Sequence, residues 1–288
     1  MIAPMLISWQ KGLLADILIT NKFVIDQKAL AVLPKLKYIV VAATGFNNIH
    51  LDAVKERKIP VSNVRGYSTT SVVQQVFASL LEVLNKPSWY FDQVNKQRWV
   101  NCPDFCFIDH SICELSTLTL GIIGFGQIGS KLAEVGLSMG MKVLAYNKSK
   151  KQAQGVVFTH SLDDLLLQAD VVSLHLPLSD ESRAMINQNT LAKMKGNAIL
   201  INTGRGPLID ENELSQHLKA NPAFTAILDV LTQEPPPVDH PLLGLPNCHI
   251  TPHIAWASTK ARQQLVNGIA QNIANFRKGV WENRIYEF

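Results

Sequence analysis

Three short polar stretches contain the residue types needed to bind a carboxylate and to move a proton on and off an oxygen atom. They are Thr203-Gly204-Arg205-Gly206, Asp229 with Glu234-Pro235, and Thr251-Pro252-His253. A guanidinium binds a carboxylate through two parallel hydrogen bonds. An imidazolium can give its proton to a forming alkoxide, and a carboxylate beside it holds the ring and favours its charged form. Each stretch alone is a weak signal, because a lone arginine is usually solvated and a lone histidine is more often structural.

Each of these stretches follows a short run typical of a buried strand. The three runs are Ala198–Asn202, Phe224–Val230 and His249–Thr251. In a doubly wound parallel sheet, the carboxyl ends of the strands open onto one crevice. The sequence therefore predicts that Arg205, Glu234 and His253 lie close together at that edge.

A glycine-rich turn lies further towards the N-terminus. The apolar run Leu118–Ile123 leads into Gly124, Gly126 and Gly129, and a helical pattern follows. In such a turn the first glycine allows the tight bend, the second lets the backbone approach a pyrophosphate, and the third allows close helix packing. The strand, turn and helix context favours dinucleotide binding over the alternative, a plain glycine-rich turn.

The glycine turn and the three polar stretches together supply what hydride transfer to a 2-keto acid requires, because a nicotinamide cofactor performs the redox step itself. Four further residues that follow strands at the same edge are expected to contact this cofactor. They are His175, Pro177, Thr203 and Gly204.

The residue after the next strand bears on coenzyme choice. A site for NAD normally has an acidic residue there, which binds the ribose 2′-hydroxyl. This chain has Asn147, followed by Lys148 and Lys150. An asparagine can bind a hydroxyl without repelling a phosphate, and the lysines could attract one. NAD(H) and NADP(H) are both compatible with this stretch, and a solvated basic turn is its structural alternative.

Short strand-like runs alternate with helical ones along the chain, which indicates an α/β fold with parallel strands. The character changes near residue 70, where long helical patterns begin. The predicted strands are Ile17–Thr20, Tyr38–Ala43, Val61–Val64, Met141–Tyr146 and Ala169–Leu174. The predicted helices include Asp26–Val32, Leu51–Arg57, one capped by Thr70 or Ser71, Trp89–Trp99, one with an Asp210 and Glu213 capping box, and one capped by Ser258 or Thr259.

Composition excludes several classes of protein. The 288 residues are 47% hydrophobic and 17% charged, with a net charge of +4 spread along the chain, so nucleic acid is not an expected partner. No stretch is apolar enough to cross a membrane and no signal peptide is expected, so we predict a cytoplasmic protein. The four cysteines have neither zinc-ligand nor redox spacing, which predicts no metal site and free thiols that are at least partly buried.

Longer stretches give the sequence a resemblance to the D-2-hydroxyacid dehydrogenase family, and within it to the glycerate dehydrogenases, also called hydroxypyruvate reductases. The resemblance covers about residues 15 to 280. Its matching stretches are Pro34–Tyr38 with Ala43–Asn47, Cys102–Phe107, Gly121–Gly129, Asn202–Gly206, Leu228–Val230 with Glu234–Pro235, and Thr251–Trp256.

The resemblance implies roles for individual residues. Arg205 would anchor the substrate, His253 would donate and accept the proton, and Glu234 would be the partner of His253. Backbone groups around Gly45 and Phe46 would receive the substrate carboxylate. The remaining implied roles concern the cofactor, with Gln127 and Ile128 at the pyrophosphate and Asp229 at the nicotinamide.

The implied fold is a Rossmann domain over residues 71–257 that interrupts a smaller flavodoxin-like substrate domain made of residues 1–70 and 258–288. The implied reaction is the reversible reduction of hydroxypyruvate or glyoxylate to D-glycerate or glycolate with NADH or NADPH. The resemblance also implies a homodimer formed through the helical region Val72–Trp99.

Two departures from the family keep alternatives open. Asn147 replaces the usual acid, and only Met1–Ala15 stands where members normally have a first strand and helix, so we expect a substrate domain that lacks its first βα unit. An inactive truncated homologue is one alternative. A non-enzymatic, nucleotide-sensing protein like the transcriptional corepressors of this fold is the other.

Overall fold

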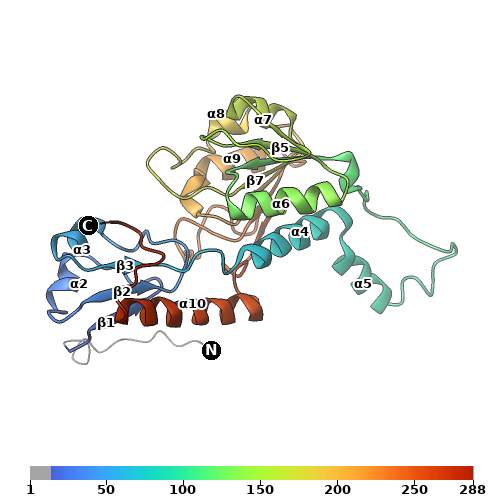
Figure 1. Cartoon of the computed structure of the whole chain (residues 1–288). Helices are drawn as coiled ribbons and strands as arrows, with labels where there is room; N and C mark the ends of the chain where they lie inside the picture. Colours follow the sequence, from blue (N-terminus) through green and yellow to red (C-terminus); the bar gives the residue numbers. More distant parts are fainter. Residues whose placement is uncertain (1–13, 288) are drawn as a thin grey trace. The chain divides into compact units, whose positions relative to one another are not determined.

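The computed structural model describes residues 14–287, so most of the Met1–Ala15 segment lies outside the described residues. Within this range the chain divides into two compact units, one containing the segments up to Ser68 and from Ala257 onward, the other Thr69–Trp256. The elements of both units are shown in Figure 1.

The first unit contains a parallel sheet with the order β1-β2-β3 among its described residues. Its elements are β1 (Ile17–Thr20), α2 (Gln27–Ala31), β2 (Tyr38–Val41), α3 (Leu51–Glu56), β3 (Val61–Ser62) and α10 (Thr259–Arg277). Strand β2 is buried throughout, as a central parallel strand requires. The long helix α10 packs on this sheet, where the Phe276 ring stacks on Tyr38 with 4.3 Å between centroids.

The second unit is built around a seven-stranded parallel sheet with the order β10-β9-β8-β7-β4-β5-β6. Its strands are β4 (Thr119–Ile123), β5 (Lys142–Tyr146), β6 (Val156–Phe158), β7 (Val171–Leu174), β8 (Ile199–Asn202), β9 (Thr225–Leu228) and β10 (Cys248–Ile250). Its helices are α4 (Thr69–Asn85), α5 (Pro87–Asn95), α6 (Gln127–Ser138), α7 (Leu162–Gln168), α8 (Gln188–Leu191) and α9 (Glu211–Ala220), with short 3-10 turns at Leu115–Thr117 and Gly206–Leu208. The doubly wound parallel sheet predicted from the sequence is confirmed.

Alternate strand residues divide this sheet between two cores. Ile123 and Leu200 point into a core shared with α7, α8 and α9. Ile122 and Ile201 point into the opposite core, shared with α4 and α6. Both faces of the sheet are therefore covered, which explains why its strands are continuous apolar runs.

Several local predictions need correction. Thr70 and Ser71 were expected to cap a helix, but α4 already begins at Thr69. Asp210 caps α9 as predicted, yet the Glu213 carboxylate accepts a hydrogen bond from the backbone N–H of Gln188 at 2.6 Å, instead of completing a capping box. All four cysteines are free, but Cys106 is exposed, whereas the sequence suggested thiols that are at least partly buried.

No helix in the described range is both long and apolar enough to pass through a lipid bilayer.

Candidate active site

The carboxyl ends of three adjacent strands carry the three polar stretches. Strands β8, β9 and β10 are neighbours in the sheet and run parallel, so their carboxyl ends lie at one edge. Arg205 follows β8, Glu234 follows β9 and His253 follows β10. The three stretches therefore follow strands that end at the same edge of the sheet.

The imidazole of His253 and the carboxylate of Glu234 are in direct contact. The distance from His253 Nδ1 to Glu234 Oε2 is 2.6 Å, and each side chain is a little over one quarter exposed, at 27% and 29%. A carboxylate that accepts from Nδ1 fixes the tautomer and the orientation of the ring. The Nε2 atom of His253 is thereby left as the nitrogen that can exchange a proton with a ligand.

Arg205 is held by its own loop next to the Glu234 segment. The buried Asn202 side chain donates to the Arg205 carbonyl at 2.8 Å and accepts from the Gly204 N–H at 3.0 Å. Gly206 then packs directly on the chain at Leu231, because an added Cβ would stand 2.0 Å from the Leu231 carbonyl carbon. The Leu231 N–H in turn donates to Glu234 Oε1 at 3.2 Å. The segments of Arg205 and Glu234 therefore lie side by side.

Asp229 fixes the loop that carries His253. Its carboxylate is 3% exposed, and it accepts hydrogen bonds from Thr251 Oγ1 at 2.5 Å, from Ile254 N at 2.9 Å and from Ala255 N at 2.8 Å. His253 has a φ of 54°, in the left-handed region that non-glycine residues seldom adopt. The Asp229 carboxylate thus holds the loop on both sides of a residue with an unfavourable backbone conformation. The family resemblance implied a contact of Asp229 with the nicotinamide and gave no sign of this structural role.

The glycine turn requires glycine at two of its three positions and is open at the third. Gly124 has a φ of 95°, and a Cβ on Gly129 would stand 2.2 Å from the Gly124 carbonyl oxygen, so both positions require glycine. A Cβ on Gly126 would meet no heavy atom within 4 Å. Gly126 caps α6 without a side-chain hydrogen bond, which leaves the first N–H groups of this helix, at Gln127 and Ile128, for an anion.

The residues after β5 are tied to the loops around them. Asn147 Oδ1 accepts from the Phe125 N–H at 2.9 Å, and its Nδ2 donates to the Ser149 carbonyl and hydroxyl at 2.9 and 2.8 Å. Lys148 Nζ lies 2.6 Å from Glu181 Oε2. This hydrogen bond raises the pKa of Lys148 and lowers the pKa of Glu181. Sequence reasoning did not single out Glu181, because nothing in its own stretch indicates a distant lysine.

His175 and Pro177 lie beside the glycine turn. A Cβ on Gly124 would stand 2.6 Å from the His175 carbonyl oxygen, and the His175 ring shares a hydrogen bond with Ser173 Oγ through Nε2 at 2.8 Å. Burial lowers the pKa of His175 to about 4, so the ring is neutral near pH 7. The Pro177 carbonyl accepts from Ser182 Oγ at 2.9 Å.

One buried polar atom at the carboxyl edge has no partner within residues 14–287. The Thr203 hydroxyl, just after β8 and before Gly204, is buried and makes no hydrogen bond to any described residue. Buried polar atoms are normally satisfied. This atom therefore fits a site that is completed by a bound molecule, and together with the open space at Gly126 it supports a dinucleotide at this edge.

Gly45 and Phe46 belong to the first unit, in the turn that follows β2. The turn is fixed by the Thr44 hydroxyl, which donates to the Val64 carbonyl at 3.0 Å, and by the Asn63 amide, which donates to the Thr44 carbonyl at 2.6 Å. The turn lies at the carboxyl end of a parallel strand, where open α/β sheets bind ligands.

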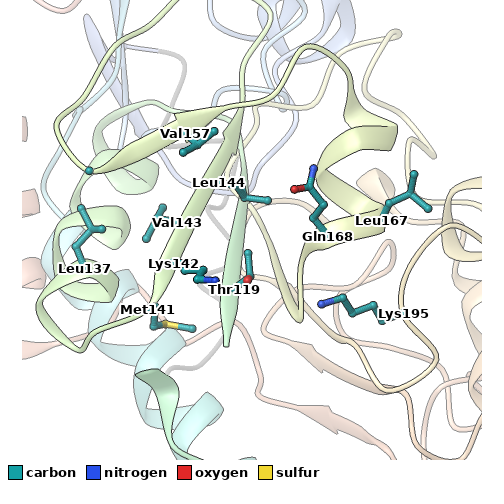
Figure 2. A pocket seen from close by; sticks show the side chains of 11 residues that line it. Thr119, Leu137, Met141, Lys142, Val143, Leu144, Val157, Leu167, Gln168 and Lys195 are labelled. Carbon is teal, nitrogen blue, oxygen red and sulfur yellow. The ribbon is translucent and has the colours of Figure 1, made fainter. Parts of the chain in front are cut away.

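A separate groove of about 670 Å³ lies at the opposite edge of the large sheet. Figure 2 shows the side chains that line it, among them Thr119 at the start of β4 and Lys142 at the start of β5. Because these residues begin their strands, the groove lies at the amino edge, away from the glycine turn and from His253.

Comparisons with known proteins point to one family. The sequence profile of the D-isomer specific 2-hydroxyacid dehydrogenase, NAD binding domain, matches residues 77–255. Hydroxypyruvate reductase of Blautia hydrogenotrophica is 39% identical over 268 residues, which span 92% of this chain and 83% of that protein. Glycerate dehydrogenase of Methylorubrum extorquens is 38% identical over 271 residues, which span 93% and 85%.

Solved structures agree with these sequence matches. D-lactate dehydrogenase from Aquifex aeolicus, complexed with NAD and lactic acid, superposes with a TM-score of 0.87 at 32% identity and covers 97% of this chain and 89% of that one. An acyclic imino acid reductase in complex with NADPH and D-Arg superposes with a TM-score of 0.86 at 32% identity, over 96% and 88%.

Proposed function

We propose, from the premise that this chain belongs to the D-isomer specific 2-hydroxyacid dehydrogenase family, that it reduces hydroxypyruvate to D-glycerate or glyoxylate to glycolate. The reaction class is that of the family, a hydride transfer between a nicotinamide cofactor and a 2-keto acid. The proposal concerns the substrate and the role of each residue.

The residues of the glycine turn fit the cofactor. Gly126 leaves space for a pyrophosphate, and the N-terminus of α6 supplies N–H donors and a favourable helix dipole. We assign the Thr203 hydroxyl, the Gly204 backbone, and the chain at His175 and Pro177 to contacts with the same molecule. When bound, the reduced nicotinamide supplies the hydride.

The protein residues act on the keto acid. Arg205 binds its carboxylate. His253 gives the proton on Nε2 to the carbonyl oxygen as the carbonyl carbon gains the hydride, so the product is a 2-hydroxy acid. Glu234 holds the ring through Nδ1. In the reverse direction, neutral His253 accepts the hydroxyl proton.

The observation that carries this proposal is the 2.6 Å contact between His253 and Glu234, beside the Arg205 loop. An acid and an anion anchor at one edge of the sheet are what reduction of a 2-keto acid needs. No observation favours a non-enzymatic sensor over this function.

The choice of a small polar acid rests on relatives. Besides the two proteins above, a relative from Thermococcus litoralis that is named glyoxylate reductase is 36% identical over 269 residues. Glyoxylate and hydroxypyruvate both place a carboxylate next to the reacting carbonyl and differ in one small substituent. A site that anchors the carboxylate can therefore accept both.

Initial rates of cofactor oxidation test the proposal. The purified protein is assayed with hydroxypyruvate, glyoxylate and pyruvate, each with NADH and with NADPH, by the absorbance of the reduced nicotinamide. We expect kcat/KM for hydroxypyruvate or glyoxylate to exceed that for pyruvate by at least about tenfold, or about 1.4 kcal/mol of transition-state binding. A preference for pyruvate, or no turnover with any of the three acids, would contradict the proposed substrate.

We further propose that the protein is a homodimer through the helical region Val72–Trp99. Helix α5 has no buried residue, and Phe91 and Trp99 are 67% and 53% exposed. Such exposed apolar side chains commonly mark an interface. Light scattering should give the mass of two chains, and Phe91→Asp should give one. A wild-type mass of one chain would refute the dimer.

A further inference from the structure

The ion pair between Lys148 and Glu181 joins the two loops that flank the glycine turn. Lys148 follows β5, Glu181 lies in the loop after β7, and their charged groups are 2.6 Å apart. In the sheet, β4 stands between β5 and β7. The pair therefore bridges the carboxyl end of β4, where the glycine turn begins.

The loop that carries Glu181 is well fixed, although the ion pair itself is exposed. Ser182 is buried, and its hydroxyl accepts from the Ser179 N–H at 2.8 Å and donates to the Pro177 carbonyl at 2.9 Å. The side chains of Lys148 and Glu181 are 82% and 74% exposed. An ion pair so exposed to water is weak. A ligand anion can therefore take Lys148 away from Glu181 without disturbing the loop.

Asn147 does not select against a phosphate at this position. Its carboxamide is neutral, and its hydrogen bonds to Phe125 and Ser149 fix it beside the glycine turn. Glu181 is an acidic side chain that instead reaches this stretch from another loop. An aspartate directly after β5 would repel a 2′-phosphate. In this chain the acidic group near that position is Glu181, which also binds Lys148.

We propose that Glu181 determines coenzyme preference by competing with the 2′-phosphate of the coenzyme for Lys148. With a 2′-hydroxyl the ion pair stays closed. With a 2′-phosphate, Lys148 leaves Glu181 for the more highly charged anion, and Glu181 remains as a nearby negative charge. This inference deepens the proposed function, because it rests on dinucleotide binding, but it does not depend on which keto acid is reduced.

Calorimetric titration with two nucleotides that differ in the 2′-phosphate tests this inference without turnover. The probes are adenosine 2′,5′-bisphosphate and adenosine 5′-monophosphate, and the variants are Glu181→Gln and Lys148→Gln. Glu134→Gln is the matched control, because Glu134 makes an exposed ion pair of the same 2.6 Å length with Lys131 on α6.

We expect Glu181→Gln to tighten binding of the bisphosphate by about three- to tenfold, as removal of one nearby like charge implies, and to change the monophosphate affinity less than about twofold. Lys148→Gln should weaken the bisphosphate by a similar factor, and Glu134→Gln should change neither affinity. In 1 M salt the effect of Glu181→Gln should largely disappear.

The inference is overturned if Glu181→Gln leaves the bisphosphate affinity unchanged or shifts both nucleotides equally. It is also overturned if Lys148→Gln binds the bisphosphate as tightly as the wild type, because another group would then receive the phosphate. The titration contains no keto acid, so its result is independent of the substrate assay. If none of the three keto acids is reduced but Glu181→Gln still changes the nucleotide selectivity as expected, the proposed substrate is contradicted and this inference is supported.

Discussion

We expect the Asp229 carboxylate to stabilise the second unit and to fix the position of His253. Asp229→Asn keeps the size of the side chain but replaces one acceptor oxygen with an NH2 group. In the better orientation of the amide, its oxygen still faces Thr251 and Ile254, while the NH2 group meets the Ala255 N–H, which now donates to Asp229 at 2.8 Å. Two donors would then face each other in a site that is 3% exposed.

The magnitude follows from these contacts. The change loses one hydrogen bond to a charged group, worth about 1.5–3 kcal/mol, and weakens two others from charged to neutral. The total is about 2–4 kcal/mol, which for a unit of this size lowers Tm by about 4–16 °C. Because the same hydrogen bonds fix the loop on both sides of His253, kcat should also fall by at least about tenfold.

Scanning calorimetry of the purified variant measures this effect. Asp239→Asn is the control, since Asp239 lies in the same loop region but is exposed; it should leave Tm and kcat unchanged. A Tm for Asp229→Asn within about 1 °C of the wild type would show that the carboxylate does not hold this loop, and the explanation for the position of His253 would be wrong.

Three further predictions concern other parts of the second unit. Gly126→Ala should leave Tm nearly unchanged, because the added Cβ meets no protein atom within 4 Å, but it should weaken NADH binding at least about tenfold in a fluorescence titration. Gly129→Ala should lower Tm, because its Cβ would stand 2.2 Å from the Gly124 carbonyl oxygen. Equal behaviour of the two variants would refute the assignment of Gly126 to the cofactor. Burial holds the pKa of His175 at about 4, below its ordinary 6.5. The unfolded chain therefore binds a proton first as pH falls, and up to about 3 kcal/mol of stability is lost between pH 6.5 and 4. The Tm of His175→Gln should depend less on pH over this window, and parallel plots of Tm against pH for the variant and the wild type would contradict this. Burial raises the pKa of Cys248 to about 12, so a thiol reagent at pH 8 should modify exposed Cys106 in the native protein and Cys248 only after unfolding, as peptide mapping would show.

Features encoded by neighbouring residues were predictable from the sequence. The glycine turn is local, because Gly124 and Gly129 impose the bend on their own segment. The proximity of Glu234 and His253 was also predictable, since both follow strands and parallel strands end at one edge of a sheet. The strand β6 (Val156–Phe158) was not predicted, because it has three residues, none of them fully buried, and so lacks a long apolar run.

Features that depend on partners far apart in the chain were not predictable. Asp229 was assigned to the cofactor, and its hydrogen bonds to the loop of Thr251 become visible only when β9 and β10 are side by side. Likewise, the sequence allows Lys148 either to attract a phosphate or to lie in a solvated basic turn, and it gives no sign of the partner Glu181, 33 residues away. Hydrogen-bond partners of this kind are set by the folded topology and not by local pattern.

The central claim is that His253 supplies the proton for reduction of the keto acid. Single-turnover measurement with His253→Gln, in parallel with titration of NADH binding, tests it most directly. The account predicts that the variant binds NADH like the wild type and that its rate of cofactor oxidation with hydroxypyruvate falls about 10²- to 10⁴-fold. Oxidation at a near-normal rate by a variant that still binds NADH would contradict the account.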